Sequence, residues 1–353
     1  MNDYTVVRSS TGAVVAPGVW SDDVEIDIRV KKNTVTKFFF AEDDEEAVAD
    51  RNHELRIFRR IQLAADVDNT FTVPIYASGI MSQRALNQFN FNSHIFERQI
   101  EKSAMLSFPY IVYGYGGIDM IDMPKIGLSE FLSLLVTLVK GIARMHADGY
   151  VHRDIKPVNL MYHGRRKRLF LVDFGLAIKT KNMYAKGEVF VISSSYPYFP
   201  PEWQMIKELM KTPIDSIESI GSDYIFQQCS KNLNAYVGTQ PIWTRNRDSH
   251  QLQTEQWWRE LTRQSKVLSA DLKGLNLMKA LFLEFGPTVD IYALGISIAM
   301  IVDKGIVNPN KHLVDLINVM MSFNMYERPN ADQVVDELDL IVNEIEKYGL
   351  DLD

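Results

Sequence analysis

Two short motifs constrain this chain more than any other feature of its sequence. The first is the polar run Tyr150-Val-His-Arg-Asp-Ile-Lys-Pro-Val-Asn-Leu160. The second, Asp173-Phe-Gly175, begins fourteen residues after Asn159 and follows the apolar run Leu169–Val172. At equal residue frequencies, the pattern H-R-D-x-K-x-x-N arises by chance at roughly 3 in 10⁷ starting positions. An accidental polar loop therefore does not explain it.

The residue types in these motifs suit one kind of chemistry. Asp154 and Asn159 lie five positions apart on one predicted loop, and Asp173 starts the next loop. Transfer of a phosphoryl group needs a carboxylate that accepts or orients the attacking hydroxyl, and two oxygen ligands that hold Mg²⁺ against the phosphates. A lysine beside the carboxylate neutralises charge that develops on the transferred group, and Lys156 has that place.

The first third of the chain has the pattern of a small β-rich unit. The acidic run Glu42-Asp-Asp-Glu-Glu46 predicts the start of a helix that continues to about residue 61, because acidic side chains favour a helix N-terminus. Alternating polar and apolar residues, rich in β-branched and aromatic types, predict strands. These strands cover residues 24–30, 34–40, 70–77 and 108–113. The polar residues 81–107 are expected to be an insertion.

The rest of the chain is predicted to be mainly helical. After Gly116-Gly117, apolar residues recur every three or four positions from Leu128 to Met145. Residues 288–302 are apolar on nearly every side, which predicts a buried helix, and two more helical segments follow within 312–345. The predicted fold class is α+β. A small β-rich lobe covers residues 1–113, and a larger lobe covers residues 114–353 with an insertion at about 203–287.

The motifs and this organisation resemble the eukaryotic-type protein kinase superfamily over most of the chain. The resemblance implies the bilobal protein-kinase fold, with ATP and Mg²⁺ as cofactors. It implies that Asp154 is the catalytic base and that Lys156 neutralises the transferring phosphate. It also implies that Asn159 and Asp173 are the Mg²⁺ ligands.

The resemblance extends into the small lobe. Lys37, in Val35-Thr-Lys-Phe38, corresponds to the strand lysine that grips the α- and β-phosphates of ATP. Its expected ion-pair partner is Glu54, seventeen residues later, with Glu46 as the alternative. Phe58 lies one turn after Glu54 and fits a position in the hydrophobic spine, which favours Glu54.

Residues 109–119 correspond to the last strand of the small lobe and to the hinge that pairs with adenine. Tyr113 is placed at the gatekeeper position, with Ile111 as the alternative. Tyr115 lies in the hinge, and Asp119 is expected to accept a hydrogen bond from a ribose hydroxyl.

The glycine-rich loop departs from the family pattern. Only Gly12 remains where the family prefers three glycines, which let backbone N–H groups approach phosphate closely. Gly12 is aligned with the last of these glycines, and Val14 with the valine above adenine. An ordinary hairpin turn explains this glycine nearly as well. Nucleotide affinity is therefore the family property that the sequence supports least.

Further matches concern the scaffold and the substrate. Asp290 matches a buried helix aspartate that braces the catalytic loop, and Glu202 and Arg328 match a buried ion pair of the family. Ser195 lies seven residues before Glu202, where serine/threonine kinases carry a Ser or Thr. Together with Lys156, this favours protein substrates with Ser or Thr acceptors over tyrosine.

Composition narrows the expected partners. A net charge of −7 provides no general attraction to nucleic acid or anionic lipid, so neither is expected as a partner. The longest apolar run, residues 291–302, is too short to span a bilayer. Cys229 is the single cysteine, which fits an intracellular protein of the cytoplasm or nucleus. A finer likeness to divergent kinases of large DNA viruses would place it in a host cell or virion.

Three functions are weighed against these features. The favoured one is an ATP- and Mg²⁺-dependent serine/threonine protein kinase. A catalytically weak pseudokinase acting as a nucleotide-binding scaffold is the first alternative, favoured by the poor glycine loop and the insertion at 203–287. A kinase of a small molecule is the second, but such relatives generally lack the counterparts of Lys156, Glu202 and Arg328. The insertion itself is open between regulator docking, an autoinhibitory element and added scaffold.

Overall fold

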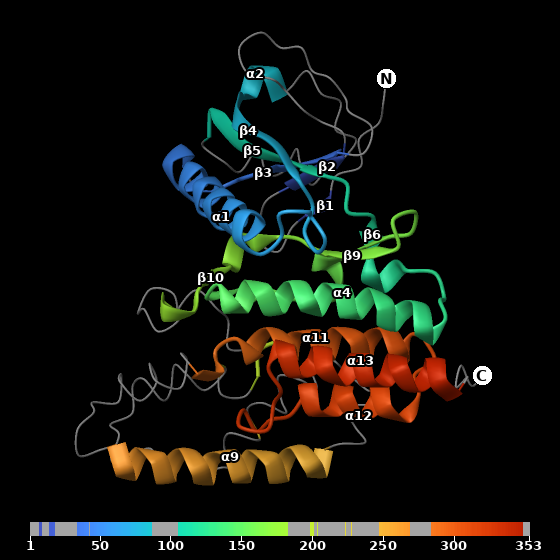
Figure 1. Cartoon of the computed structure of the whole chain (residues 1–353). Helices are drawn as coiled ribbons and strands as arrows, with labels where there is room; N and C mark the ends of the chain where they lie inside the picture. Colours follow the sequence, from blue (N-terminus) through green and yellow to red (C-terminus); the bar gives the residue numbers. More distant parts are fainter. Residues whose placement is uncertain are drawn as a thin grey trace.

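The computed structural model describes residues 34–41, 43–86, 105–182, 247–268 and 284–348. It also describes the short pieces 7–8, 14–17 and 198–200 and the single residues 203, 223 and 227. In Figure 1 a β-sheet with one long helix beside it lies above a group of helices. The α+β organisation that the sequence predicts, a small β-rich lobe and a larger mainly helical lobe, is confirmed.

The small lobe is built on an antiparallel sheet of five strands in the order β1-β2-β3-β5-β4. The strands are β1 (Val7–Arg8), β2 (Val14–Pro17), β3 (Thr34–Phe38), β4 (Ile75–Ser82) and β5 (Ser107–Gly114). Lys37 of β3 is buried, and the register places it opposite Ile111 of β5. Val35 lies opposite Tyr113. The strand lysine and the end of β5 are therefore neighbours.

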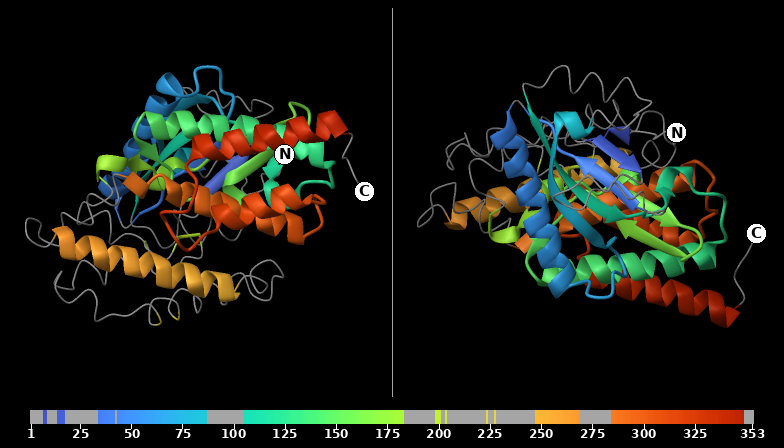
Figure 2. Two further views of the ribbon diagram at one scale, coloured as in Figure 1. Left: turned by 60° about the horizontal axis from the view of Figure 1, so that its bottom comes forward. Right: turned by 90° about the horizontal axis from the view of Figure 1, so that it is seen from above.

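Helix α1 (Asp44–Ala64) runs beside this sheet (Figure 2). It begins after Asp43, whose side chain accepts a hydrogen bond from the Glu46 backbone N–H and so satisfies one of the free donors of the first turn. Its buried face packs against β5 of the small lobe and against η3 (Phe174–Leu176) of the second motif. The helix predicted from residue 42 is confirmed, and α1 contacts both the small-lobe sheet and the second motif.

One predicted strand is wrong in position. The strand expected over residues 70–77 begins instead at Ile75, and β4 continues to Ser82. The preceding segment turns around the buried carboxylate of Asp66, which accepts hydrogen bonds from the backbone N–H groups of Thr70 and Thr72. The threonines fit a strand pattern, but this local acceptor takes the N–H groups that a strand would need.

The expected insertion at 81–107 lies only partly within the described residues. The first residues of that stretch complete β4 and form α2 (Gln83–Leu86). Residues 87–104 lie outside the described residues, as does the strand expected over residues 24–30.

The large lobe is built on helices whose apolar spacing the sequence shows. They are α4 (Leu128–Ala147), α11 (Thr288–Asp303), α12 (Lys311–Met320) and α13 (Ala331–Tyr348). α4 lies beneath the small lobe, with α13 packed against it (Figure 1). α11 is buried on nearly every side, as predicted, because it lies at the centre of the large core. In the described part of the chain, no helix combines the length and apolarity that crossing a membrane would require.

Part of the expected insertion is a helix, α9 (Arg247–Leu268). Trp257 and Trp258 of this helix are buried in the same apolar core as α11. The side chain of Gln253 accepts a hydrogen bond from the backbone N–H of Phe323 at 3.1 Å. This part of the insertion therefore packs against the large lobe as added scaffold.

Short strands and single turns between the lobes carry the two motifs. The strands are β6 (Ile118–Asp119), β7 (Tyr150–Val151), β8 (Leu160–His163), β9 (Arg168–Leu171) and β10 (Ile178–Lys179). They form the small sheets β6-β8-β9 and β10-β7. The turns are η1 (Met120–Asp122), η2 (Pro157–Asn159), η3 (Phe174–Leu176) and η4 (Thr180–Asn182). Hydrogen-bonded strands thus fix both ends of each motif loop.

The connection between the lobes requires glycine at one position. Gly117 has a φ of +115°, and a Cβ there would lie 1.9 Å from the Tyr162 carbonyl oxygen of β8. Any other residue would have to push β6 and β8 apart. The glycine pair in the sequence therefore marks the point where the hinge passes over the small sheet of the large lobe.

Candidate active site

Lys37 joins the two lobes through a buried ion cluster. Its Nζ lies 2.7 Å from Oε2 of Glu54 on α1 and 2.6 Å from Oδ1 of Asp173 in the second motif. Glu54 is almost fully buried, whereas Glu46 is exposed on the first turn of α1. Of the two glutamates considered from the sequence, the structure pairs Glu54 with Lys37.

The cluster holds one positive charge against two carboxylates. Burial alone would lower the pKa of Lys37, but the charges of Asp173 and Glu54 raise it well above its ordinary value. Burial raises the pKa of Glu54, and the charge of Lys37 only partly offsets this. Breaking such a buried pair by removing one partner is costly, since it leaves a charge without compensation. Because its carboxylates outnumber its cation, the cluster favours a further cation beside Asp173.

Tyr113 completes the surroundings of Glu54. Its hydroxyl donates a hydrogen bond of 2.7 Å to Oε1 of Glu54, so both oxygens of that carboxylate are bound. Burial and the charge of Glu54 raise the pKa of the Tyr113 hydroxyl well above its ordinary value, which keeps it a donor. Ile111, the alternative considered for the gatekeeper, is fully buried in the small-lobe core. Tyr113 is thus tied to α1 through the carboxylate of Glu54.

Three aromatic rings stack between α1 and the first motif. The Phe174 ring lies 4.6 Å from the Phe58 ring and 4.7 Å from the His152 ring, both in edge-to-face contact. Such contacts add to the energy of apolar burial. The spine position expected for Phe58 from its place after Glu54 is thus occupied by a ring in contact with the second motif.

His152 is held as a neutral imidazole. Its Nδ1 accepts a hydrogen bond from the Asp154 backbone N–H at 3.2 Å, so Nε2 carries the proton and donates to the Val172 carbonyl at 3.1 Å. Burial lowers the pKa of His152 below its ordinary value. A second ring proton would oppose the Asp154 N–H, so the neutral form shapes the loop that bears Asp154.

Asp154 lies in a compact polar group. Its carboxylate accepts hydrogen bonds from Nζ of Lys156 at 3.0 Å and from Nδ2 of Asn159 at 2.8 Å. Nδ2 of Asn159 also donates to the backbone carbonyl of Asp154 at 2.8 Å. The three residues that the sequence selected from the first motif are therefore in direct contact. Because the amide nitrogen of Asn159 makes both of these hydrogen bonds, its amide oxygen is the atom that can coordinate a cation.

The backbone of the first motif is fixed by Asp290 of α11. Its carboxylate accepts hydrogen bonds from the backbone N–H groups of His152 at 2.7 Å and Arg153 at 2.8 Å, and it lies 2.9 Å from Nε2 of His146. Burial would raise the pKa of Asp290, but the bond and charge of His146 hold it below its ordinary value. The brace expected at Asp290 from the sequence is present.

Two motif residues have left-handed backbone conformations. Arg153 and Asp173 both have a φ of +65°, a region that residues other than glycine seldom occupy. Such strain persists only where surrounding contacts enforce it, and it is concentrated at functional sites. Here the Arg153 backbone is held by Asp290, and the Asp173 side chain by Lys37.

The predicted nucleotide-binding residues of the hinge are only partly placed. Tyr115 is about one third exposed, and its ring lies 6.2 Å from the ring of His163. Asp119 is half-buried in β6, where burial and the charge of Asp122 raise its pKa. The backbone of Val14 pairs with Phe38 of β3.

Several sequence predictions lie outside the described residues. They are the predictions for Gly12, Ser195 and Glu202. Arg328, the expected partner of Glu202, is buried and donates hydrogen bonds to the Ser322 carbonyl and the Thr288 hydroxyl.

Sequence reasoning missed two contributors to the site. His146 lies in the last turn of α4 and belongs to neither motif, yet it contacts Asp290. Tyr198 is close enough to Asp154 that burial and the charge of Asp154 together raise its pKa to about 12. The residues of the site come from strands and helices far apart in the sequence, and only the two contiguous motifs could have been found by spacing alone.

The chain is similar in sequence to known protein kinases. A family model described as the protein kinase domain matches residues 118–338, more than half of the chain. Human cell division cycle 7-related protein kinase is 36% identical over 73 residues, which cover 21% of this chain and 12% of that protein. A probable CTD kinase subunit alpha homolog of Encephalitozoon cuniculi is 26% identical over 154 residues, or 38% of this chain and 46% of that protein.

A bacterial protein is also similar to this chain. The probable serine/threonine-protein kinase pknA2 of Bifidobacterium longum is 27% identical over 146 residues, or 36% of this chain and 19% of that protein. The chain therefore matches less than half of the length of each of these three relatives.

Replacing Tyr113 by Phe tests the bond to Glu54. Loss of a buried hydrogen bond to a charged acceptor is expected to lower the free energy of unfolding by about 1.5–3 kcal/mol. Urea denaturation measures this change. Tyr76, half-exposed on β4, provides the control, and Tyr76→Phe is expected to change stability by less than about 0.5 kcal/mol. Equal effects of the two substitutions would contradict the role given to the Tyr113 hydroxyl.

The neutral state of His152 predicts a pH dependence. Because its folded pKa is below the ordinary 6.5, the unfolded chain binds a proton that the folded chain does not as the pH falls below 6.5. Stability should therefore fall with pH in that window, and His152→Gln should flatten the profile. Urea denaturation of wild type and His152→Gln across the window is the measurement. A wild-type slope in His152→Gln would contradict the assignment.

Proposed function

The chain belongs to the protein kinase domain family, and on that premise we propose that it is an active enzyme that transfers the γ-phosphate of ATP to Ser or Thr hydroxyls of proteins. The observation that carries the proposal is the contact group of Asp154, Lys156 and Asn159. A scaffold has no need of a buried carboxylate held by both a lysine and an amide. The separate cluster around Lys37 supplies the groups that nucleotide binding would need.

In the proposed reaction, the Asp154 carboxylate orients the substrate hydroxyl and accepts its proton. The hydroxyl oxygen then forms a bond to the γ-phosphorus while the bond from that phosphorus to the oxygen bridging the β-phosphate breaks. The products are a phosphoryl ester, ADP and the proton held at Asp154. Lys156, 3.0 Å from both oxygens of Asp154, stands where it can stabilise charge on the transferring group.

The residues present fit a Mg²⁺ ion. Asn159 and Asp173 would hold it through side-chain oxygens, the donors that Mg²⁺ prefers. The described residues contain no group of three or more His, Cys, Asp or Glu side chains able to hold a metal. This fits a nucleotide site, in which Mg²⁺ takes one or two protein ligands and completes its shell with phosphates and water. When bound, the ion would neutralise charge on the phosphates.

Nucleotide contacts are assigned by the same premise. We propose that Lys37 binds the α- and β-phosphates, with Glu54 and Tyr113 holding it in place. Tyr115 and Asp119 would lie at the adenine and ribose, with Val14 above the base. Gly12 keeps the phosphate-loop role expected from the sequence.

The choice of Ser or Thr acceptors rests on Lys156 and on Ser195. The printed name of the Bifidobacterium relative, a probable serine/threonine-protein kinase, is consistent with this choice. Regulator docking at 203–287, an intracellular location and the likeness to kinases of large DNA viruses stay predictions from the sequence.

Phosphate transfer tests the proposal directly. Wild-type protein, labelled ATP, Mg²⁺ and a generic basic protein should yield phosphoserine or phosphothreonine on acid hydrolysis. Asp154→Ala should reduce transfer by at least about 10²-fold, since a positioned base contributes about 10²–10⁴-fold. Asp68→Ala, at an exposed aspartate, is the matched control and should keep wild-type activity.

Two outcomes would overturn this reading. A folded wild type that transfers no more phosphate than Asp154→Ala would favour the scaffold alternative. Label on small metabolites but never on protein would favour the small-molecule kinase. Phosphotyrosine as the product would correct the acceptor class alone.

A further inference from the structure

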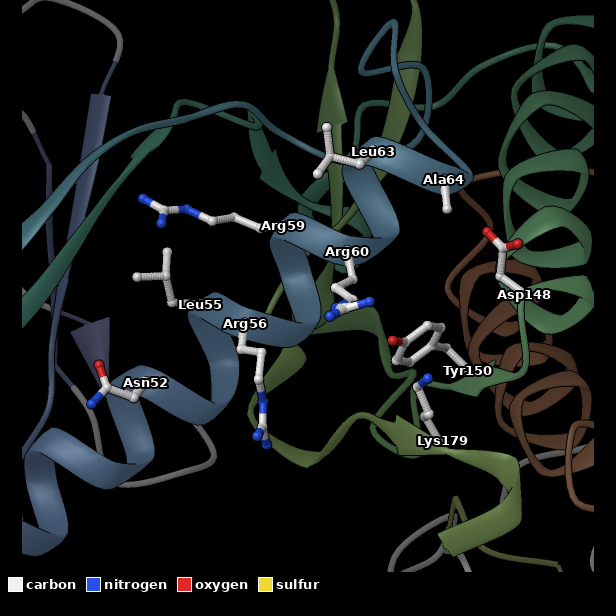
Figure 3. A pocket seen from close by; sticks show the side chains of 10 residues that line it. All are labelled: Asn52, Leu55, Arg56, Arg59, Arg60, Leu63, Ala64, Asp148, Tyr150 and Lys179. Carbon is white, nitrogen blue, oxygen red and sulfur yellow. The ribbon is translucent and has the colours of Figure 1, made fainter.

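A hollow of about 710 Å³ lies beside α1, along the part of that helix that bears Arg56 and Arg60 (Figure 3). α1 forms one wall, and the turn after α4 with strands β7 and β10 forms the other. Its charged and polar lining consists mainly of Arg56, Arg59, Arg60, Asp148, Tyr150 and Lys179. Four cationic side chains thus face one carboxylate, in a chain whose net charge is −7.

The three arginines are unusual for a helix surface. No acidic residue lies three or four positions before or after Arg56, Arg59 or Arg60 on α1. The spacing instead sets Arg56 beside both Arg59 and Arg60, and like charges at such spacings cost a helix about 0.2–0.5 kcal/mol per pair. In the described part of the chain, none of the three forms an ion pair. An unbalanced group of this kind points to a ligand that supplies the negative charge.

The dipole of α1 does not account for the whole group. Positive charge is favourable in the last turn of a helix, but the effect falls off within that turn. Arg56 lies more than two turns before the end of α1 at Ala64. Lys179 belongs to β10 on the opposite wall, and its Nζ lies 5.4 Å from the centre of the buried Tyr150 ring. The cations therefore converge from two separate elements.

Figure 3 shows how these side chains lie. Arg60, Tyr150 and Lys179 gather in the gap between α1 and the strands, with Arg56 beside them on the helix. Arg59 extends away from this group. Arg56, Arg60 and Lys179 hence lie around one hollow, beside the buried Tyr150.

We propose that this hollow binds a phosphorylated segment of a protein partner, with the phosphate on Arg56, Arg60 and Lys179. A phosphoserine carries a charge of about −1.5 to −2, so one such group offsets at least half of the positive charge by which the four cations exceed Asp148. Guanidinium groups bind phosphate through paired N–H donors. Leu63, 79% exposed at the rim of the hollow, offers apolar contact to the residues that flank the phosphate.

Occupation of the hollow would act on the ion cluster through α1. Arg56 follows Glu54 by two positions, and the two side chains lie on opposite sides of the helix, one exposed and one buried. A phosphate bound to Arg60 and Lys179 would tie α1 to β10, which follows the second motif. This tie would favour the pairing of Lys37 with Glu54 and so raise the rate of phosphate transfer, an inference that rests on the proposed kinase function.

Direct binding tests the site independently of catalysis. The probe is a short fluorescent peptide with one phosphoserine between glutamates and a leucine, titrated with the full chain bearing Asp154→Ala so that no transfer occurs. Fluorescence anisotropy should show saturable binding. The same peptide with serine and glutamines in place of the charged residues should not bind.

The double variant Arg56→Gln/Arg60→Gln decides the location. It should weaken binding at least about tenfold, because each arginine donates charge-assisted hydrogen bonds. Arg84→Gln, at an exposed arginine of α2, should bind like its parent. The double variant removes like-charge repulsion, so its melting temperature should not fall. Unchanged affinity in the double variant, or no peptide binding by the parent, would overturn the proposal.

Two further experiments distinguish a protein partner from a membrane surface, and the binding site from the proposed function. Arginine-dependent binding to phosphatidylserine vesicles without binding to the phosphopeptide would overturn the protein partner in favour of a membrane surface. In the wild-type background the peptide should raise phosphate transfer, and this rise should vanish in the double variant. If wild type transfers no phosphate while the peptide still binds through the arginines, the proposed function fails and the binding site stands.

Discussion

The buried ion cluster of Lys37, Glu54 and Asp173 is the interaction on which the rest of the site depends. Its three members come from β3, from α1 and from the second motif, so one ammonium group fixes the small lobe, the long helix and the large lobe relative to one another. Buried charges are expensive unless each is paired and hydrogen-bonded. Tyr113 completes the bonding of Glu54, and the aromatic contact of Phe58 with the second motif covers the same junction.

A second buried carboxylate performs the equivalent task in the large lobe. Asp290 holds the backbone on which Asp154 is mounted, and Lys156 and Asn159 then hold the Asp154 side chain. The proposed catalytic carboxylate is thus anchored to α11, which lies within the large core, while the proposed phosphate-binding lysine is anchored to the small lobe. Motion of α1 would alter the pairing of Glu54 with Lys37 directly, which is why a ligand on the exposed face of α1 is suited to regulation.

The sequence predicts the parts of this site that depend on short spacings. Asp154, its neighbours in the first motif, and Asp173 are identifiable because they occupy two contiguous runs with fixed chemistry. Glu54 could be ranked above Glu46 only through its position relative to Phe58, and the structure pairs it with Lys37. The bond from Tyr113 to Glu54 depends on strand register, which a single sequence does not give. The strand expected over residues 70–77 was misplaced for a different reason, because the Asp66 carboxylate accepts the backbone N–H groups that a strand would have used.

The central claim is that the Lys37 cluster and the Asp154 group together form a Mg²⁺-dependent nucleotide site. Titration calorimetry with a non-hydrolysable ATP analogue tests it. Wild type should bind the analogue with Mg²⁺ and much more weakly without it, because Asn159 and Asp173 would act through the ion. Lys37→Met should lose most of the affinity even with Mg²⁺ present. A folded wild type that binds no analogue, or binding that depends on neither Mg²⁺ nor Lys37, would contradict it.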